Sequence, residues 1–314
     1  MGAEAARDSF CALDVGLIDE ARALVKGRLR EGLKGSTATT FGIGGPIRAV
    51  VTVDDAQELA AVRSLLWSAQ QPVRNIGNGS NLLIADAGLD AWVIRLGAGF
   101  RGVEPLGGGA LRVGGAASLM NVARRVSDEG LSGLEFAAGI PATFGGALFM
   151  NAGAHGAEIG ERVVEVTGVM PDGAVKVWTH RDLPWRYRSS GLPAGVTVTS
   201  AVLQLCEGDR ASIAELCAAC LAERRARQPL ALPSAGSVFK NPSPDLPAGR
   251  VIEEAGLKGA RIGGAVVSEL HANWIVNPNK EASAADVAAL IAMCIERVKA
   301  RSGITLEPEV KIWV

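Results

Sequence analysis

Apolar and polar positions follow two periods along the chain, and these periods predict alternating helices and strands. Residues 15–31 place apolar side chains three to four positions apart, which predicts an amphipathic surface helix. The β-branched run 50–53, a helix that continues to about Ala69 and a short strand that ends at Ile76 predict a β-α-β unit. A strand and a helix that ends at Gly130 repeat the pattern.

The character of the pattern changes near Gly208. Before it, a Pro-Asp-Gly turn at 171–173 separates two strands, so residues 15–209 predict one mixed α/β unit. After it, a smaller α+β unit is expected from 210 to 305, followed by a strand at the C-terminal end. The helices predicted in this second part are 210–227, 248–255 and 283–301, the last with a capping box formed by Ser283 and Asp286.

Composition narrows the functional classes. The 314 residues are 48% hydrophobic and 21% charged, with a formal net charge of −1, which is typical of a globular protein with two or three domains. A dedicated nucleic-acid-binding protein would normally carry a basic face, so no nucleic-acid partner is predicted. The 39 glycines have no collagen-like period and indicate many tight turns and close approaches of backbone to a ligand.

Targeting and cysteine patterns predict a cytoplasmic protein. No apolar run approaches the ~20 residues that a membrane-spanning helix needs, and residues 1–16 lack the apolar core of a signal peptide. The five cysteines are scattered and odd in number, which favours reduced thiols. Cys217 and Cys220 form a C-x-x-C inside a helical pattern with no second ligand pair, so we interpret them as packing residues and predict no metal site.

Two glycine-rich stretches are candidates for binding a nucleotide-like ligand. The loop "NIGNGSNLLIAD" (75–86) follows a strand, and its backbone N–H groups would suit a pyrophosphate, although an ordinary strand–turn–strand is an equal alternative. The stretch 133–160 has little side-chain bulk, which fits either a tightly packed loop or a backbone surface against a large flat ligand. Two such stretches favour an extended dinucleotide over a small anion.

Three further groups of polar residues are candidates for chemistry. Arg186 and Arg188 flank Tyr187 and could clamp an anionic substrate, or form a solvated turn. The stretch "PSAGSVFKNP" (233–242) presents a serine hydroxyl, and "LEPEV" (306–310) places two glutamates on one face of the predicted terminal strand. With only three histidines and no G-x-S-x-G elbow, a serine hydrolase is disfavoured, which leaves proton donation or phosphate binding for the serine of 233–242.

Taken together, these blocks resemble the UDP-N-acetylenolpyruvoylglucosamine reductase (MurB) family. The resemblance rests on ordered blocks spread over residues 35–310. They are "TTFGIGGP" (39–46), "IGNGSNLLIAD" (76–86), "GLEFAAGIPATFGGALFMNAGAHGAEI" (133–159), "YRSSGL" (187–192), "PSAGSVFKNP" (233–242), the stretch 248–277 and "LEPEV" (306–310). The short segment between Arg188 and Thr197 resembles the second, shorter subtype of the family, which lacks a substrate-covering insertion.

The resemblance implies a cytoplasmic flavoenzyme of peptidoglycan precursor synthesis. Its fold would be α+β (mixed α/β), with an FAD-binding domain of the vanillyl-alcohol-oxidase (PCMH) type before a smaller α+β substrate domain. The implied bounds are 1–34 for an N-terminal helical segment, 35–209 for the FAD-binding domain, 210–305 for the substrate domain and 306–314 for a terminal strand. FAD would be bound non-covalently, NADPH would be the co-substrate, and a UDP-sugar would be reduced to UDP-N-acetylmuramate. The oligomeric state stays open, with a monomer favoured.

The same resemblance implies roles for individual residues. Ser237 matches the proton donor to C2 of the enolpyruvyl group, and Arg188 and Glu309 match the other two catalytic positions. Tyr187, Arg188, Lys240 and Asn241 are implied substrate-binding residues. Leu270 stands where many relatives carry lysine and receives no role. The implied cofactor contacts are Gly77, Asn78, Gly79, Ser80, Asn81, Gly139, Ile140, Pro141, Gly145, Gly146, Asn151, Ala152 and Gly153.

Two other functions compete with this interpretation. Another FAD oxidase or dehydrogenase of the same fold would explain residues 39–160 but not "GSVFKNP" or "LEPEV". A non-catalytic nucleotide-sugar binder would be expected to have lost one of Ser237, Arg188 and Glu309, and all three are present.

Overall fold

The structure is a computed structural model, and it describes residues 15–314. The chain forms two compact units, each built from segments that are not contiguous in sequence. Among the described residues, unit 1 comprises 15–31, 49–78 and 91–223, and unit 2 comprises 32–48, 79–90 and 224–314. The predicted domain bounds at residues 34, 209 and 305 stay a prediction, and the first part of the predicted N-terminal segment, 1–14, lies outside the described residues.

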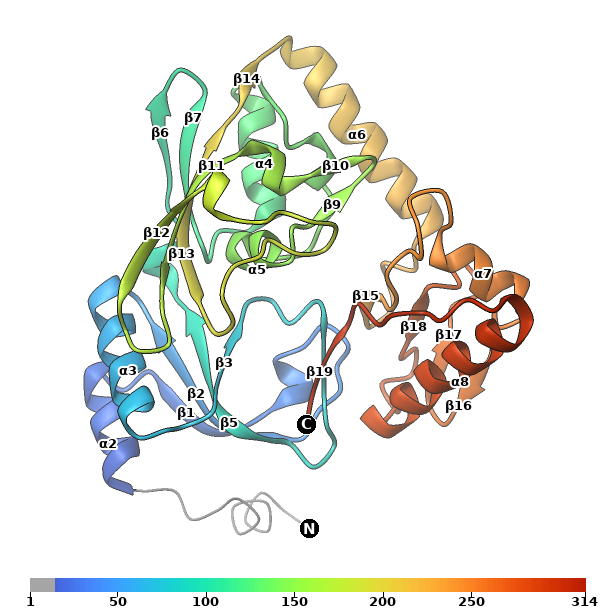
Figure 1. Cartoon of the computed structure of the whole chain (residues 1–314), viewed down its shortest axis with the longest axis horizontal. Coiled ribbons are helices and arrows are strands. Elements are labelled where there is room, and N and C mark those ends of the chain that lie inside the picture. The colour runs from blue at the N-terminus through green and yellow to red at the C-terminus, as the bar shows by residue number, and fades with distance from the viewer. Residues whose placement is uncertain (1–14) are drawn as a thin grey trace. The chain divides into compact units, whose positions relative to one another are not determined.

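Unit 1 holds most of the regular structure (Figure 1). The chain passes from one unit to the other within β1 (Leu29–Lys34), β2 (Pro46–Val53), β5 (Leu89–Leu96) and α6 (Arg210–Arg227), and also between Asn78 and Gly79. The remaining elements of unit 1 are α2 (Val15–Leu24), α3 (Ala56–Ser68), β3 (Val73–Ile76), η2 (Ala98–Phe100), β6 (Val103–Gly107), β7 (Ala110–Gly114), α4 (Leu119–Asp128), β8 (Leu131–Ser132), η3 (Glu135–Ala137), α5 (Phe144–Phe149), β9 (Gly153–Ala154), β10 (Ala157–Glu158), η4 (Ile159–Arg162), β11 (Val163–Val169), β12 (Val175–Thr179), η5 (His180–Asp182), β13 (Thr197–Gln204) and β14 (Cys206–Glu207).

Two sheets organise unit 1, and each has its own core. The four-stranded sheet has the order β1-β2-β5-β3, and α2 and α3 lie side by side against it, burying Ala21, Leu59 and Leu66 with Trp92 of β5. The second sheet is antiparallel, with the order β12-β11-β13-β7-β6. Its apolar side chains pack with those of α4 and α5, such as Phe144. This packing positions the start of α5.

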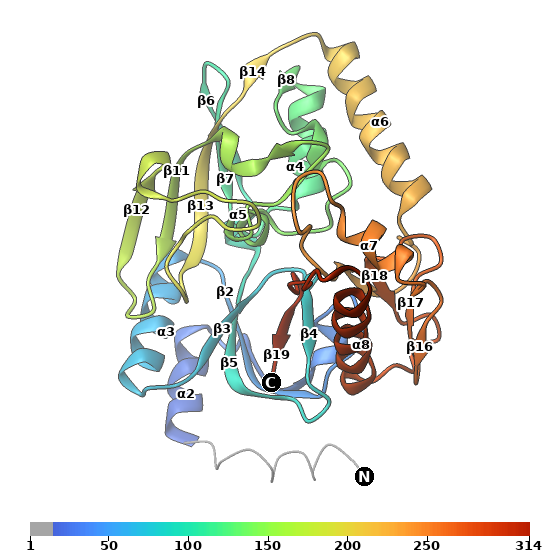
Figure 2. The same cartoon turned by 45° about the vertical axis from the view of Figure 1, so that its right-hand side comes forward.

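Unit 2 is a smaller α+β unit with a separate core. A four-stranded antiparallel sheet has the order β15-β18-β17-β16, and β19 pairs in parallel with β4. Helix α8 contacts β16 and β17, as Figure 2 shows, and buries Val287, Leu290 and Ile291. The elements are η1 (Gly35–Thr37), β4 (Leu82–Ile84), β15 (Ser234–Ser237), α7 (Ala248–Glu254), β16 (Arg261–Ile262), β17 (Ala265–Val267), β18 (Trp274–Val276), α8 (Ala284–Ser302) and β19 (Lys311–Trp313).

The predicted helix ends agree with the structure in three places. The helix predicted over 210–227 is α6. The capping box at the start of α8 forms as predicted, with the N–H of Asp286 donating to the Ser283 hydroxyl and the N–H of Ser283 donating to the Asp286 carboxylate. Gly130, which follows the C-cap residue Glu129 of α4, takes the left-handed conformation with φ of +75°. Local capping chemistry therefore decided these ends.

Two predicted elements are wrong in extent. The helix predicted over 15–31 ends at Leu24, because Lys26 and Gly27 take positive φ values of 50° and 84° and turn the chain into β1. The terminal strand begins only at Lys311, so Glu309 precedes it instead of lying within it. In both places, pairing with strands distant in sequence sets the boundary, and the local pattern does not contain that information.

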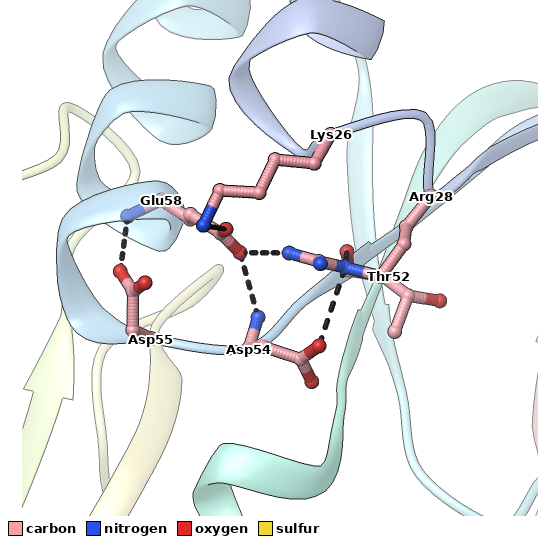
Figure 3. Close-up of polar contacts among 6 residues, drawn as sticks. All are labelled: Lys26, Arg28, Thr52, Asp54, Asp55 and Glu58. Carbon is pink, nitrogen blue, oxygen red and sulfur yellow. Dashed lines mark hydrogen bonds and ion pairs between the residues drawn. The ribbon is translucent and has the colours of Figure 1, made fainter.

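A buried carboxylate fixes the connection between α2, β2 and α3 (Figure 3). Glu58 accepts a hydrogen bond of 2.5 Å from Arg28 and one of 2.9 Å from the N–H of Asp54. The ammonium of Lys26 lies 3.5 Å from its second oxygen. The hydrogen bond from Arg28 is the main reason that the pKa of Glu58 lies below its ordinary value. Glu58 is therefore ionised at neutral pH.

Membrane-spanning helices and metal-ligand clusters are both absent from residues 15–314. No helix in this range combines the length and the apolar character that crossing a membrane requires. The same residues contain no group of three or more His, Cys, Asp and Glu side chains that could hold a metal ion. Cys217 and Cys220 are half-buried on α6, where Ile213 is the buried residue, so their interpretation as core packing residues is wrong.

Candidate active site

The two glycine-rich stretches meet in unit 1. A Cβ atom added at Gly77 would lie 2.2 Å from the hydroxyl oxygen of Thr143, so only glycine fits at this approach. The amide of Asn78 donates to the carbonyl of Pro141 at 3.2 Å. Thr143 also accepts from the N–H of Gly146 and thereby caps α5. Asn78, Pro141 and Gly146 are exposed, so these contacts place backbone-rich surface from both stretches together.

The rest of the second stretch is mostly covered by its own unit. Gly145 is buried and donates to the carbonyl of Gly115 at 2.9 Å, and its added Cβ would lie 3.1 Å from the same oxygen. Gly139 is buried as well, whereas Ile140 is half-buried. Glycine at 145 therefore allows α5 to pack directly on β13 and β7 of the large sheet.

Asn151 has a structural role in unit 1 that sequence reasoning missed. Its side chain is 1% exposed, with φ of +45°, and accepts from the N–H of Gly160 at 2.9 Å. Its amide donates to Glu158 at 2.6 Å and to the carbonyl of Arg186 at 3.0 Å. The predicted cofactor contact at Asn151 can thus involve little more than its backbone. Ala152 and Gly153, the next two predicted contacts, are half-buried beside it.

The carbonyl held by Asn151 belongs to the turn that carries Arg188. The N–H and C=O groups of Arg186 and Ser189 pair reciprocally at 2.9 Å, which forms a tight turn over 186–189. Arg188 has φ of +58°, in the left-handed region, and its guanidinium lies 4.8 Å from the centre of the Tyr187 ring. Tyr187 is 45% exposed and Arg188 is half-buried, so the pair presents an aromatic face and a partly covered cation at the surface of unit 1.

A buried arginine holds the strand that leads into the first glycine loop. Arg63 of α3 is 2% exposed and donates at 2.6 Å to Asn75 of β3, to the carbonyl of Gly195 and to the hydroxyl of Thr197. All three acceptors are neutral, and burial lowers the pKa of Arg63 to about 10. The guanidinium is still charged at neutral pH. Its helical position gave no sequence signal, because an arginine on an amphipathic helix is ordinarily exposed.

In unit 2 the remainder of the first loop lies against the serine segment, residues 234–241. Gly79 has φ of +65°, and an added Cβ would lie 2.1 Å from the carbonyl oxygen of Ala38. The carbonyl oxygen of Ser80 is the atom nearest to a Cβ built on Gly236, at 3.9 Å. The amide of Asn81 donates to the carbonyl of Glu309 at 3.3 Å. The predicted cofactor contacts Ser80 and Asn81 therefore lie beside the predicted catalytic residues of this unit.

The serine segment brings Ser237 and Glu309 together. Ser237 ends β15 opposite Trp274 of β18, after an irregular step at Gly236, where φ is +74°. The carbonyl of the next residue, Val238, accepts from the N–H of Glu309 at 2.7 Å. Ser237 and Glu309 are both half-buried, which leaves their side chains partly accessible.

Lys240 and Asn241, the predicted substrate-binding residues of unit 2, already have partners within it. Lys240 forms an ion pair with Glu307, and its N–H donates to the carbonyl of the same residue at 2.9 Å. The side chain of Asn241 accepts from the N–H of Ala248 at 3.0 Å, at the start of α7. Leu270 is 50% exposed. A substrate that recruits Lys240 would have to compete with Glu307.

Each unit, taken by itself, holds groups that are suited to adding a proton to a carbon next to a carboxylate. Unit 2 holds a hydroxyl and a carboxylate, Ser237 and Glu309, whose backbones are one hydrogen bond apart through Val238. Unit 1 holds the cation Arg188 and the glycine-lined surface around Gly77. A cation can stabilise a developing enolate, and a positioned hydroxyl can donate a proton to it.

Comparison with known proteins covers both parts of the chain. Residues 47–179 match a family model described as an FAD binding domain, and residues 228–313 match one described as the C-terminal domain of UDP-N-acetylenolpyruvoylglucosamine reductase. These matches confirm the predicted fold class, an FAD-binding domain before a smaller domain within a mixed α and β fold.

Relatives and solved structures extend the similarity over most of the chain. It is 43% identical over 288 residues to UDP-N-acetylenolpyruvoylglucosamine reductase 2 of Symbiobacterium thermophilum, covering 91% of this chain and 92% of the relative. Identity to the Bacillus subtilis UDP-N-acetylenolpyruvoylglucosamine reductase is 41%, covering 87% and 90% of the two chains. The crystal structure of the Thermus caldophilus enzyme of the same name superposes with a TM-score of 0.79 at 37% identity, covering 91% of this chain and 100% of that one.

Proposed function

Since the chain belongs to the UDP-N-acetylenolpyruvoylglucosamine reductase family, we propose that it reduces UDP-N-acetylglucosamine enolpyruvate to UDP-N-acetylmuramate. In this proposal FAD is bound non-covalently, NADPH is the reductant, and the reaction serves peptidoglycan precursor synthesis in the cytoplasm. The observation that carries the proposal is the similarity over 91% of this chain to a reductase of that name. The chain acts on small molecules in this proposal, which leaves the oligomeric state open and favours a monomer.

The glycine-lined surface of unit 1 fits a large flat cofactor. Gly77 and Gly146 keep side-chain bulk away from both sides of Thr143, and exposed Asn78 and Pro141 border the same place. We propose that the cofactor contacts run from Gly77 to Asn81 and over Gly139, Ile140, Pro141, Gly145, Gly146, Asn151, Ala152 and Gly153. FAD, when bound, supplies hydride transfer between NADPH and the sugar. Main-chain N–H groups in such loops are well suited to a pyrophosphate.

Ser237 acts in this proposal as the acid that protonates C2. Once C3 of the enolpyruvyl group has received a hydride, C2 carries enolate character, conjugated with the carboxylate. A serine hydroxyl is a weak acid, but an enolate carbon is a strong base, and fixed geometry favours the transfer. Gly236 and Val238 hold the backbone on either side of Ser237 in defined positions, which supplies that geometry.

Arg188 and Glu309 support the same step. The Arg188 guanidinium balances the negative charge that develops on the enolate, with Tyr187 packed against it. Glu309 orients or polarises the group that Ser237 protonates. Tyr187, Lys240 and Asn241 bind the UDP-sugar, and Lys240 leaves Glu307 to do so. Residues 35–209 would then be the FAD-binding domain, 210–305 the substrate domain, and 306–314 the terminal segment with Glu309.

One set of experiments on the purified full chain tests this function. The protein should be yellow and should release intact FAD on denaturation. It should oxidise more than one equivalent of NADPH per FAD only when the enolpyruvyl sugar is present, with UDP-N-acetylmuramate as the product seen by mass spectrometry. A colourless protein that cannot be reconstituted with FAD would exclude a flavoenzyme. NADPH oxidation without that product would favour a different FAD oxidoreductase.

A further inference from the structure

A buried asparagine forms hydrogen bonds with the backbone directly after Ser237. Asn273 lies just before β18 in unit 2, and 4% of it is exposed. Its side-chain oxygen accepts from the N–H of Phe239 at 2.9 Å, and its amide donates to the carbonyl of the same residue at 2.8 Å. Its backbone carbonyl accepts from the N–H of Val238 at 2.9 Å. Three hydrogen bonds thus bind one residue to the two that follow Ser237.

The other side of this short stretch is held by the segment that carries Glu309. The carbonyl of Val238 accepts from the N–H of Glu309 at 2.7 Å and from that of Val310 at 3.3 Å. The N–H of Lys240 donates to the carbonyl of Glu307 at 2.9 Å. The peptide groups after Ser237 therefore lie between Asn273 and the Glu309 segment. A shift on the Asn273 side would move Ser237 and Glu309 relative to each other.

The loop that carries Asn273 is itself anchored. The N–H of Asn273 donates to Nδ1 of His271 at 3.2 Å, so this nitrogen bears a lone pair and the imidazole is neutral. Burial lowers the pKa of His271, which favours the same neutral form. Gly249 of α7 lies against the His271 ring, since an added Cβ there would be 3.1 Å from Cε1. The contacts of His271 with Asn273 and with Gly249 therefore hold the loop that carries Asn273 in place.

We propose that Asn273 is a positioning residue for the protonation step, acting through Ser237. The inference rests on the proposed function, because it assumes that Ser237 is the acid. Only a side chain that donates and accepts at once can satisfy both polar groups of Phe239, and an amide does so with the geometry of a peptide. An error of about 1 Å in the position of a reacting group can slow a reaction by about 100-fold. The amide holds Ser237 within that tolerance.

Asn277 offers a matched control in the same unit. It is fully buried, its amide donates to the carbonyl of Phe41 at 3.3 Å, and its side-chain oxygen accepts from the N–H of Ala282 at 3.0 Å. It therefore uses its side chain as Asn273 does, but on residues outside the serine segment. An aspartate at either position keeps the shape and the acceptor, loses the donor and places a charge in the interior.

The experiment compares the FAD-loaded full-length wild type with Asn273→Asp and Asn277→Asp in anaerobic stopped-flow measurements. For Asn273→Asp, reduction of the flavin by NADPH (bleaching) should stay near the wild-type rate. The limiting rate of flavin reoxidation (return of colour) with saturating enolpyruvyl sugar should fall by about 100-fold. The half-saturating sugar concentration should change little. Asn277→Asp should lower the midpoint of thermal unfolding as much as Asn273→Asp does. Its rates of flavin reduction by NADPH and of flavin reoxidation by the sugar should both stay at the wild-type level.

The pH profile provides a readout that loss of stability alone would not give. Burial raises the pKa of a carboxyl, and a protonated Asp at 273 regains a donor for the carbonyl of Phe239. The rate of colour return in Asn273→Asp should therefore recover as the pH is lowered. The charged and titratable groups around this place are His271 on its own loop, Lys240 on the serine segment, Glu307 and Glu309 on the terminal segment, and Glu253, Lys258 and Arg227 around His271. They are present in the wild type and in Asn277→Asp as well, so a recovery at low pH that occurs in Asn273→Asp alone is assigned to the new carboxyl.

Each outcome separates this inference from the proposed function. If the wild type does not regain colour with the sugar, the proposed function fails and the role of Asn273 fails with it. If the wild type does so and Asn273→Asp is equally fast, only the role of Asn273 is excluded. Equal slowing in Asn277→Asp would also exclude it, because the loss would then reflect general loosening of unit 2. Should Asn273→Asp not fold, the neutral pair Asn273→Ser and Asn277→Ser replaces it with the same expected contrast in limiting rate.

Discussion

The glycine-lined surface of unit 1 and the serine segment of unit 2 are built in opposite ways. Around Gly77 and Gly146 the chain omits side chains, and the close approach to Thr143 leaves no room for a Cβ at Gly77. Around Ser237 the chain instead adds side chains that grip the backbone, with Asn273 holding both polar groups of Phe239. The first region exposes backbone that side chains do not cover, and the second immobilises the backbone on either side of a serine hydroxyl.

This difference assigns different consequences to mutations in the two regions. Added bulk on the glycine-lined surface should weaken cofactor binding and leave the chemistry of the bound enzyme unchanged. Changes at the charged and hydroxyl groups should leave cofactor binding intact and slow the step that involves the sugar. A change in the ion cluster around Glu58, which includes no residue of either region, should affect stability alone.

The largest effect in this series is expected for Arg188→Lys. Lysine keeps the charge and meets the same constraint from the positive φ of 58°, but it cannot make the bidentate contact of a guanidinium. Losing one contact that stabilises developing charge slows a reaction by about 100- to 1,000-fold. The limiting rate of sugar reduction should fall accordingly, measured beside Arg186→Lys as the control from the same turn. Wild-type turnover in Arg188→Lys would contradict its role.

Gly77→Ala should give a smaller effect, and on a different property. The new methyl group would overlap Thr143, and overpacking of this kind costs about 1–3 kcal/mol. FAD affinity, measured by fluorescence titration of the apoprotein, should fall, while the rates of the fully loaded enzyme stay close to those of the wild type. Gly102→Ala is the control, because nothing lies within 4 Å of its added Cβ. Unchanged FAD affinity in Gly77→Ala would show that this loop does not contact the cofactor.

Glu58→Gln should change the unfolding midpoint and neither half-reaction. The pKa of Glu58 is lowered in the folded state from its ordinary value of 4.5, so the carboxylate stabilises the fold above that pH. This stabilisation should disappear as the pH falls through the lowered pKa. The midpoint difference between wild type and Glu58→Gln should therefore be largest at neutral pH and shrink below pH 4.5. The exposed Glu20→Gln serves as control, and a difference that is constant with pH would refute this account of Glu58.

The sequence predicted the parts of this molecule that depend on local chemistry. The capping box of Ser283 and Asp286 and the left-handed Gly130 can be recognised from neighbouring residues alone. The glycines that need positive φ or a close approach are also visible as glycines, although Thr143, the partner of Gly77, is not. The candidate residues themselves came from motif blocks and the family that they resemble.

Contacts between distant segments could not be predicted in the same way. Asn273 lies 34 residues from Phe239, and no sequence pattern in either segment predicts their hydrogen bonds. Arg63 donates to Thr197, which lies 134 residues away in sequence. The helical pattern predicts a surface position for Arg63, but this contact lies in the interior. The early end of the first helix at Leu24 likewise follows from strand pairing by β1. Such features depend on tertiary structure, which overrides local preference.

The most direct test of the central claim follows the two half-reactions in Ser237→Ala. NADPH should bleach the yellow variant at nearly the wild-type rate, since this step needs no proton for the sugar. Colour should then fail to return when the enolpyruvyl sugar is added, and Ser237→Cys, which still has a proton to donate, should recover part of that rate. If Ser237→Ala regains its colour as fast as the wild type at saturating sugar, Ser237 is not the acid.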